Sequence, residues 1–160
     1  MLYQQTMKIE EDGDMIIGTS QYGHTHKAKS YNGEWITGYY VKAIDEYENA
    51  VHVIFEPTTQ FCSDGSNGGF VIINPSTLCR CLDLKDGHDN FIWEHDIVEI
   101  PMFEDGKFVI RWDNEDGKWI MVNDEDRIIV DFDNYDSGCV FVIGNEIDTL
   151  ELSNDEQREI

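Results

Sequence analysis

Short runs of β-branched and aromatic residues recur along the chain, and polar turn residues separate one run from the next. Runs of this composition are typical of β-strands. Successive strands and turns follow one another about every ten residues, a spacing that predicts a mainly β fold of the compact barrel or roll type. The strands are expected at residues 34–44, 51–55, 69–73, 96–100, 107–113, 118–123, 127–132 and 139–144.

Turn and capping residues mark the ends of several elements. Residues 114–117, Asn-Glu-Asp-Gly, lie between two apolar runs and predict a β-hairpin. The stretch 77–84 is short and mixed, and it predicts either a strand or a helical turn. A short helix is expected over the last ten residues, with Ser153 as N-cap and Glu156 completing a capping box. Residues 21–32 are interpreted as a solvated loop.

The distribution of charge divides the chain into two parts. Residues 1–80 hold 10 acidic and 5 basic side chains, whereas residues 81–160 hold 23 acidic and 6 basic ones. Turn residues cluster near 85–95, so we place a boundary there and expect two small β-rich parts at 1–90 and 91–160. The second part has about five strands and too few residues for a core that is stable alone. We expect it to pack on the first part or on another copy of itself.

The overall charge excludes some partners. The chain of 160 residues carries 33 acidic and 11 basic side chains, a net charge of −22. A field of this sign repels phosphate groups, so we expect no direct binding to nucleic acid or to an anionic membrane. The N-terminal sequence lacks the basic start and apolar stretch of a signal peptide, and no apolar run approaches the roughly 18 residues that cross a bilayer. These features predict a protein of the cytoplasm.

Acidic residues and two tryptophans in the second part form a candidate partner surface. Its members are Asp113, Glu115, Asp116, Asp124, Glu125, Asp126, Trp112 and Trp119. The acids fit a solvated face or a face for a basic partner, and we prefer the first because solubility alone explains a high net charge. Trp112 and Trp119 flank the predicted hairpin turn. Packing in the core is favoured for both, and partial exposure in a peptide-binding groove is the alternative.

No pattern of residues predicts catalysis or a bound cofactor. The sequence contains no G-x-S-x-G, no phosphate-binding loop and no dinucleotide-binding glycine pattern, and its acidic stretches fail the spacing of a calcium loop. His24 and His26 have the alternating spacing of half a metal site, but no Cys or His nearby in sequence completes it, so we expect no metal. The four cysteines are expected to be free thiols, because the chain is large enough to fold without disulfides and shows no secretion signal.

Residues 80–98, RCLDLKDGHDNFIWEHDIV, resemble the signature of the YopX family of phage and prophage proteins, in which a Lys-Asp turn precedes an Ile-aromatic-Glu-Gly-Asp-Ile-Val stretch. Two further segments are similar to the family, GYYVKA at 38–43 and VFVIGNEIDTLEL at 140–152. Residues 1–33 match poorly. The matching positions of the signature are Leu84, Lys85, Asp86, Ile92, Trp93, Glu94, Asp96, Ile97 and Val98.

Three residues stand where the family commonly has glycine: Asp83, Asp89 and His95. Glycine at such positions often supplies a positive φ, and Asp and His are among the residues that tolerate a positive φ best. We therefore predict a positive φ for at least one of the three. Asp96 is interpreted as a turn or strand-start residue whose carboxylate accepts backbone N–H groups, in preference to a catalytic acid.

The resemblance implies a β-rich protein whose C-terminal part is an SH3-type barrel, encoded by a phage or prophage and acting in the cytoplasm of a bacterial host. It supplies no catalytic residue, so we expect a non-enzymatic accessory protein that acts by self-assembly, as a homo-oligomer, and by protein–protein interaction; a basic host protein is the second expected partner. The alternative is an acidic DNA mimic that occupies the DNA-binding groove of a host nuclease, restriction enzyme or repressor. That role requires carboxylates about 7 Å apart along one face.

Overall fold

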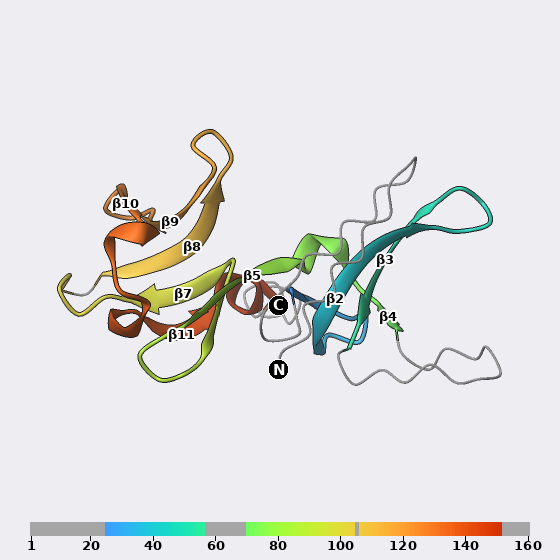
Figure 1. Ribbon diagram of the computed structural model, residues 1–160, viewed down its shortest axis with the longest axis horizontal. Coiled ribbons are helices and arrows are strands. Elements are labelled where there is room, and N and C mark those ends of the chain that lie inside the picture. The colour runs from blue at the N-terminus through green and yellow to red at the C-terminus, as the bar shows by residue number, and fades with distance from the viewer. Residues whose placement is uncertain (1–24, 57–69, 105, 152–160) are drawn as a thin grey trace, which may run out of the picture. The chain divides into compact units, whose positions relative to one another are not determined.

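The computed structural model describes residues 25–56, 70–104 and 106–151, and the chain divides into two units, Met1–Asp83 and Leu84–Ile160. Strands dominate in each unit, and antiparallel pairing organises them into two sheets (Figure 1). The mainly β fold predicted from the sequence is confirmed. The division between the units falls just before the turn-rich stretch at 85–95.

The first unit is built on one antiparallel sheet. Its elements are β1 (His26–Lys29), β2 (Trp35–Ile44), β3 (Ala50–Phe55), β4 (Phe70–Ile72), the 3₁₀ turn η1 (Pro75–Thr77) and β5 (Cys79–Lys85). The strand order is β4-β3-β2-β1-β5, and β6 (Phe91–Trp93) follows beside β5. Of the two structures expected for 77–84, the strand is the one that forms over most of the stretch.

The predicted loop at 21–32 is wrong for residues 26–29, which form β1 between β2 and β5. Ala28 in this strand is fully buried and packs with Ile54 and Ile73 in the core of the first unit. The sequence of residues 26–29 is poor in residues that favour strands, so it does not indicate one. Pairing with β2 on one side and β5 on the other holds the segment as a strand. Tertiary context therefore decides the structure of this segment.

The second unit contains a five-stranded sheet that follows β6. Its elements are β7 (Asp96–Glu99), β8 (Lys107–Asp113), β9 (Lys118–Asn123), β10 (Ile128–Asp131), the 3₁₀ turns η2 (Phe132–Asn134) and η3 (Ser137–Cys139), and β11 (Phe141–Asn145). The strand order is β10-β9-β8-β7-β11, with antiparallel pairing throughout. The hairpin predicted at 114–117 is confirmed, because β8 and β9 pair up to the residues that flank it.

The SH3-type barrel expected of the second unit is not confirmed. Within the described residues its sheet is open, with β10 and β11 as the two edges (Figure 1). β10 has only four residues and passes directly into η2. The chain then returns through η2 and η3 and places β11 beside β7.

One face of this sheet carries the core of the second unit. Side chains alternate between the two faces of a strand, and the pairing register puts partners of one row on the same face. Val98 pairs with Phe108, and Ile110 pairs with Met121; all four side chains are fully buried. Residues outside the five strands are buried as well: Ile92, Phe132 and Val140.

A short helix follows β11 at residues 146–151. The side chain of Asn145 caps it, because its Oδ1 accepts the N–H of Ile147 at 3.0 Å. The helix was predicted at 151–160, and residues 152–160 lie outside the described part of the chain. Among the residues that the structure describes, no helix has the length and apolar character needed to cross a lipid bilayer.

Candidate functional site

One buried carboxylate organises the Lys-Asp turn of the signature. Oδ1 of Asp86 accepts the backbone N–H groups of His88 and Asn90 at 2.9 and 2.8 Å, respectively. Its Oδ2 accepts the N–H of Val142 in β11 at 2.9 Å. Asp86 therefore ties the turn at 86–90 to a strand that lies more than fifty residues further along the chain.

The electrostatics of Asp86 suit this structural role. Burial by itself favours the neutral acid and raises the pKa of Asp86. The N–H groups of Val142, Asn90 and His88 outweigh burial, and the pKa of Asp86 lies below its ordinary value of 3.8. The side chain is thus an ionised acceptor at neutral pH, which is the form that its four hydrogen bonds require.

Asp96 makes a second connection to β11. Its Oδ2 accepts the N–H of Trp93 at 2.8 Å, and its Oδ1 accepts a hydrogen bond from Nδ2 of Asn145 at 3.0 Å. The carboxylate is 2% exposed. The prediction that Asp96 begins a strand and accepts backbone N–H groups is confirmed.

Asp83, Asp89 and His95 all have a positive φ. The angles are 57° at Asp83, 67° at Asp89 and 69° at His95, which confirms the prediction of at least one. His95 lies in the turn between β6 and β7. It donates its N–H to the carbonyl of Ile110 at 2.9 Å, so the left-handed residue is also anchored to β8.

The remaining positions of the signature divide between core and surface. Ile92, Trp93 and Val98 are buried, and Ile97 and Glu94 are half-buried. Leu84 is exposed, and Lys85 forms an ion pair with Asp89 at 2.9 Å while its Nζ lies 5.1 Å from the centroid of the Phe91 ring. These contacts give the signature a structural role in building the second unit.

A charged network that sequence reasoning missed joins four segments of the second unit: the β6–β7 turn, β8, the β9–β10 turn and the helix at 146–151. Nδ1 of His95 lies 3.0 Å from Oε2 of Glu146, the first residue of the helix. Arg111 in β8 contacts Glu146 at 2.9 Å and Asp124 at 3.0 Å. The members are far apart in sequence, so only the strand pairing brings them together, and no sequence signal points to the set.

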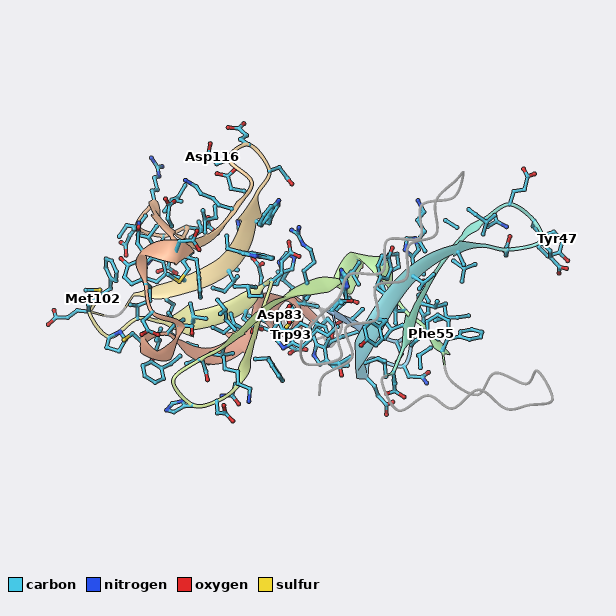
Figure 2. All side chains as sticks on the ribbon, in the orientation of Figure 1. Tyr47, Phe55, Asp83, Trp93, Met102 and Asp116 are labelled. Carbon is cyan, nitrogen blue, oxygen red and sulfur yellow. The ribbon has the colours of Figure 1, made fainter. Side chains whose placement is uncertain are left out.

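The six candidate acids do not form one patch. Three of them, Asp113, Glu115 and Asp116, belong to the β8–β9 turn, and the other three, Asp124, Glu125 and Asp126, belong to the β9–β10 turn. The two turns lie at opposite ends of β9, a strand of 6 residues and therefore about 20 Å long. Figure 2 shows Asp116 at the far tip of the β8–β9 hairpin.

Several of these acids are held by neighbours in the same unit. Oδ1 of Asp113 accepts the N–H of Glu115 at 2.9 Å and so shapes the turn. Nζ of Lys118 lies 3.0 Å from Asp131 and 3.1 Å from Asp116. These hydrogen bonds, first with Asp131 and then with Asp116, raise the pKa of Lys118 above its ordinary value of 10.5.

Trp112 and Trp119 face each other across β8 and β9. They occupy paired positions, and their rings meet edge to face with centroids 5.1 Å apart. Both are half-buried, so the core packing favoured from the sequence holds only in part. They end the core-bearing face next to the β8–β9 turn, where solvent reaches them.

The opposite face of the sheet carries an apolar row that crosses all five strands. The register aligns Gly144, Ile97, Val109, Val122 and Ile129, from β11 to β10. Exposure rises sharply at the β10 end, from 9% at Val122 to 65% at Ile129. The row therefore ends in an uncovered apolar side chain on an edge strand.

The cysteines and histidines form no cluster of chemical interest in the described part of the chain. Cys139 is an exposed free thiol, Cys79 is buried and Cys81 is half-buried, and Cys62 and His24 lie outside the described residues. The described ranges contain no group of three His, Cys, Asp or Glu side chains placed to hold a metal ion.

The first unit contains a cluster of one tyrosine and two histidines that the sequence did not indicate. Oη of Tyr40 and Nδ1 of His52 are hydrogen bonded at 2.6 Å across β2 and β3. The ring of His26 lies 5.2 Å from that of Tyr40. Burial raises the pKa of Tyr40 above its ordinary value of 10.0, so the phenol stays protonated at neutral pH.

Comparison with protein-family models gave no match to this sequence, and comparison with curated proteins gave none either. The resemblance to the YopX family therefore stays a prediction carried by the residues of the signature.

Proposed function

We propose that this protein is a non-enzymatic accessory protein of a phage or prophage that acts in the host by self-assembly and protein–protein interaction. The observation that carries the proposal is the apolar row of the second unit, which ends in the exposed Ile129 on an edge strand. Edge strands with uncovered apolar side chains favour pairing with a further strand.

The use of the signature's acids supports a role without catalysis. Asp86 and Asp96 are buried, and the carboxylate oxygens of both accept hydrogen bonds from backbone or side-chain amide N–H groups. Burial keeps both carboxylates inside the second unit, where these hydrogen bonds support the fold and a substrate in solution does not reach them. The two acids of the signature thus serve to attach its turns to β11, which is a structural role in the second unit.

The proposal is tested by the size of the full chain in solution. Sedimentation velocity between about 1 and 100 µM is expected to show a reversible oligomer, because these concentrations span the affinities of ordinary protein contacts. Added salt is expected to strengthen the association, since it screens the repulsion between copies of net charge −22. A monomer at every concentration and salt would overturn self-assembly.

The alternative function, a DNA mimic, is favoured by one observation, the net charge of −17 on residues 81–160. Its two candidate acid groups lie at opposite ends of β9, so each would have to act alone. Capture of a basic DNA-binding protein from host lysate, with release by about 0.5 M salt, would favour this function. Neutral variants of one turn and then the other would identify the group responsible.

A further inference from the structure

β10 is an edge strand without the usual protection. Among the described residues, nothing pairs with its outer side. Natural edge strands usually carry a charged side chain pointing inwards, a proline or a bulge, which prevents pairing with another chain. The middle of β10, Ile128 to Val130, has none of these, and its central side chain is 65% exposed.

The other edges in the structure are partly occupied. On β11, the N–H of Val142 is taken by Asp86, and the register is interrupted by a bulge before Gly144. On the first unit's sheet, Ile73 at the end of β4 makes a bridge to Ser30. β10 is therefore an edge of four consecutive residues that no bulge and no side-chain hydrogen bond to the main chain interrupts in the described ranges.

The charges at the two ends of β10 have opposite sign. Arg127 comes directly before the strand, and Asp131 is its last residue. Arg127 makes no ion pair within the described ranges. Asp131 contacts Lys118, and a carboxylate has lone pairs for a second cation. Ile129 and Asp131 lie on one face of the sheet, because side chains alternate along β10. Arg127 stands in the turn directly before the strand with a φ of 55°, so the alternation does not fix its side-chain direction, and Ile129 lies midway in sequence between the two charges.

We propose that two copies of this chain pair through β10, antiparallel and about a two-fold axis at Ile129. This inference deepens the proposed self-assembly and rests on it. The axis places Ile129 opposite its symmetry mate and Arg127 opposite Asp131 of the other copy, twice. The arrangement is self-complementary, as a two-fold interface requires. It joins the two five-stranded sheets into one and continues the apolar row across the axis.

A second copy fits this edge better than an unrelated strand because the sequence is antisymmetric in charge about Ile129. Positive, apolar and negative residues follow in order from 127 to 131. A two-fold axis converts that order into two attractive pairs, whereas most registers with another strand leave at least one charge unmatched. The pairs also offset part of the repulsion between two chains of net charge −22.

The first test uses two charge variants of the full chain. In Arg127→Asp two like-charged Asp–Asp pairs face each other across the axis, and in Asp131→Arg two Arg–Arg pairs do so. Each variant alone is expected to dimerise at least about tenfold more weakly than wild type, because like charges directly opposite destabilise paired strands. A mixture of the two variants is expected to form a heterodimer, since every cross pair is then attractive. Asp tolerates the positive φ of residue 127, so Arg127→Asp should fold.

A matched control separates position from charge. Lys107→Asp makes the same change in net charge on the same face of the same sheet, where residue 107 is exposed and lies on β8, two strands away from the outer side of β10. It is expected to dimerise as wild type does, within about twofold. Equal weakening by Lys107→Asp and Arg127→Asp would show a general charge effect and would overturn the register.

The second test uses a cysteine at the axis. Ile129→Cys in a Cys139→Ser background is expected to form a 129–129 disulfide on mild oxidation, since directly opposed Cα atoms in antiparallel strands lie about 4.5–5.5 Å apart. Ile143→Cys on the opposite edge is the control and should stay uncrosslinked. A wild-type oligomer with neither the crosslink nor heterodimer formation would overturn this interface and leave self-assembly standing. A monomeric wild type would overturn both proposals.

Discussion

Asp96 and Asn145 are paired directly across β7 and β11, and Nδ2 of Asn145 donates to Oδ1 of Asp96 at 3.0 Å. Both side chains are buried. Each also serves its own element: Asp96 accepts the N–H of Trp93, and Asn145 caps the helix through the N–H of Ile147. The pair therefore fixes the start of β7 and the end of β11 in one hydrogen-bonded unit.

Removal of the Asp96 carboxylate should destabilise the second unit strongly. Asp96→Ala leaves the N–H of Trp93 and Nδ2 of Asn145 buried without an acceptor, which is expected to lower the free energy of unfolding by about 2–4 kcal/mol. Urea denaturation measures the loss. The control is Glu125→Ala in the exposed β9–β10 turn, expected to stay within about 0.5 kcal/mol of wild type. Equal stability of the two variants would contradict a structural role for Asp96.

Gly87 in the Lys-Asp turn has no space for a side chain. A Cβ at this position would clash with Cε1 of Phe141 and lie 2.6 Å from the carbonyl oxygen of Gly138. Gly87→Ala is therefore expected to lower the free energy of unfolding by about 1–3 kcal/mol, the usual effect of overpacking. Thermal unfolding followed by circular dichroism would detect the loss as a lower Tm.

The matched control for Gly87→Ala is Gly144→Ala in β11. The nearest atom to a Cβ there is Cδ1 of Ile97 at 3.9 Å, an ordinary contact. This variant is expected to keep the wild-type Tm to within a few degrees, since a change of 1 kcal/mol shifts the Tm of a small domain by about 4–8 °C. A larger loss in Gly144→Ala than in Gly87→Ala would contradict the packing of the turn against β11.

Sequence reasoning found the strands where composition and turns agree. The strands at 107–113 and 118–123 form with the predicted bounds, because a four-residue turn with glycine at its end joins two runs rich in β-formers. β1 was missed because residues 26–29 are held by strands on both sides and carry no local signal. The helix at 146–151 was not predicted, because its cap, Asn145, ends a strand and carries no turn signal of its own, and the helix predicted at 151–160 lies outside the described residues beyond residue 151.

The candidate site was predictable only in part. The structural role of Asp96 and the positive φ of the glycine replacements follow from local turn chemistry, so the sequence was sufficient for them. The separation of the acids into two turns depends on which strands pair. The contact between Arg111 and Glu146 depends on it too, since a long-range register brings residues 35 positions apart together.

Asp86 should make part of the stability depend on pH in the acid range. Its pKa in the folded protein is lower than in the unfolded chain, so its contribution is fully present above the unfolded pKa and is lost as pH falls through the folded one. The unfolded value is near 3.8, so the loss should begin as pH falls to about 4 and continue below it. The free energy of unfolding is compared with that of Asp86→Asn from about pH 6 to pH 2, a range that brackets the pKa values of carboxyl groups.

The difference between wild type and Asp86→Asn is expected to be largest near neutral pH and to shrink on acidification. Acidic groups elsewhere titrate equally in both proteins, so they cancel in the difference. Asn cannot accept all the N–H groups that the carboxylate accepts, which explains the lower stability of the variant at neutral pH. A difference that stays constant from neutral to acid pH would contradict the lowered pKa.

Trp112 and Trp119 should stabilise each other beyond the area they bury. An edge-to-face pair with ring centroids 5.1 Å apart has the geometry at which aromatic side chains gain about 0.5–1.5 kcal/mol over burial alone. A double-mutant cycle with Trp112→Leu, Trp119→Leu and the double variant isolates this coupling, because leucine keeps an apolar side chain at each position. Urea denaturation of the four proteins is expected to give a coupling energy in that range. If the losses of unfolding free energy in the two single variants add up to the loss in the double variant, the two rings contribute independently, and the hairpin alone brings them together.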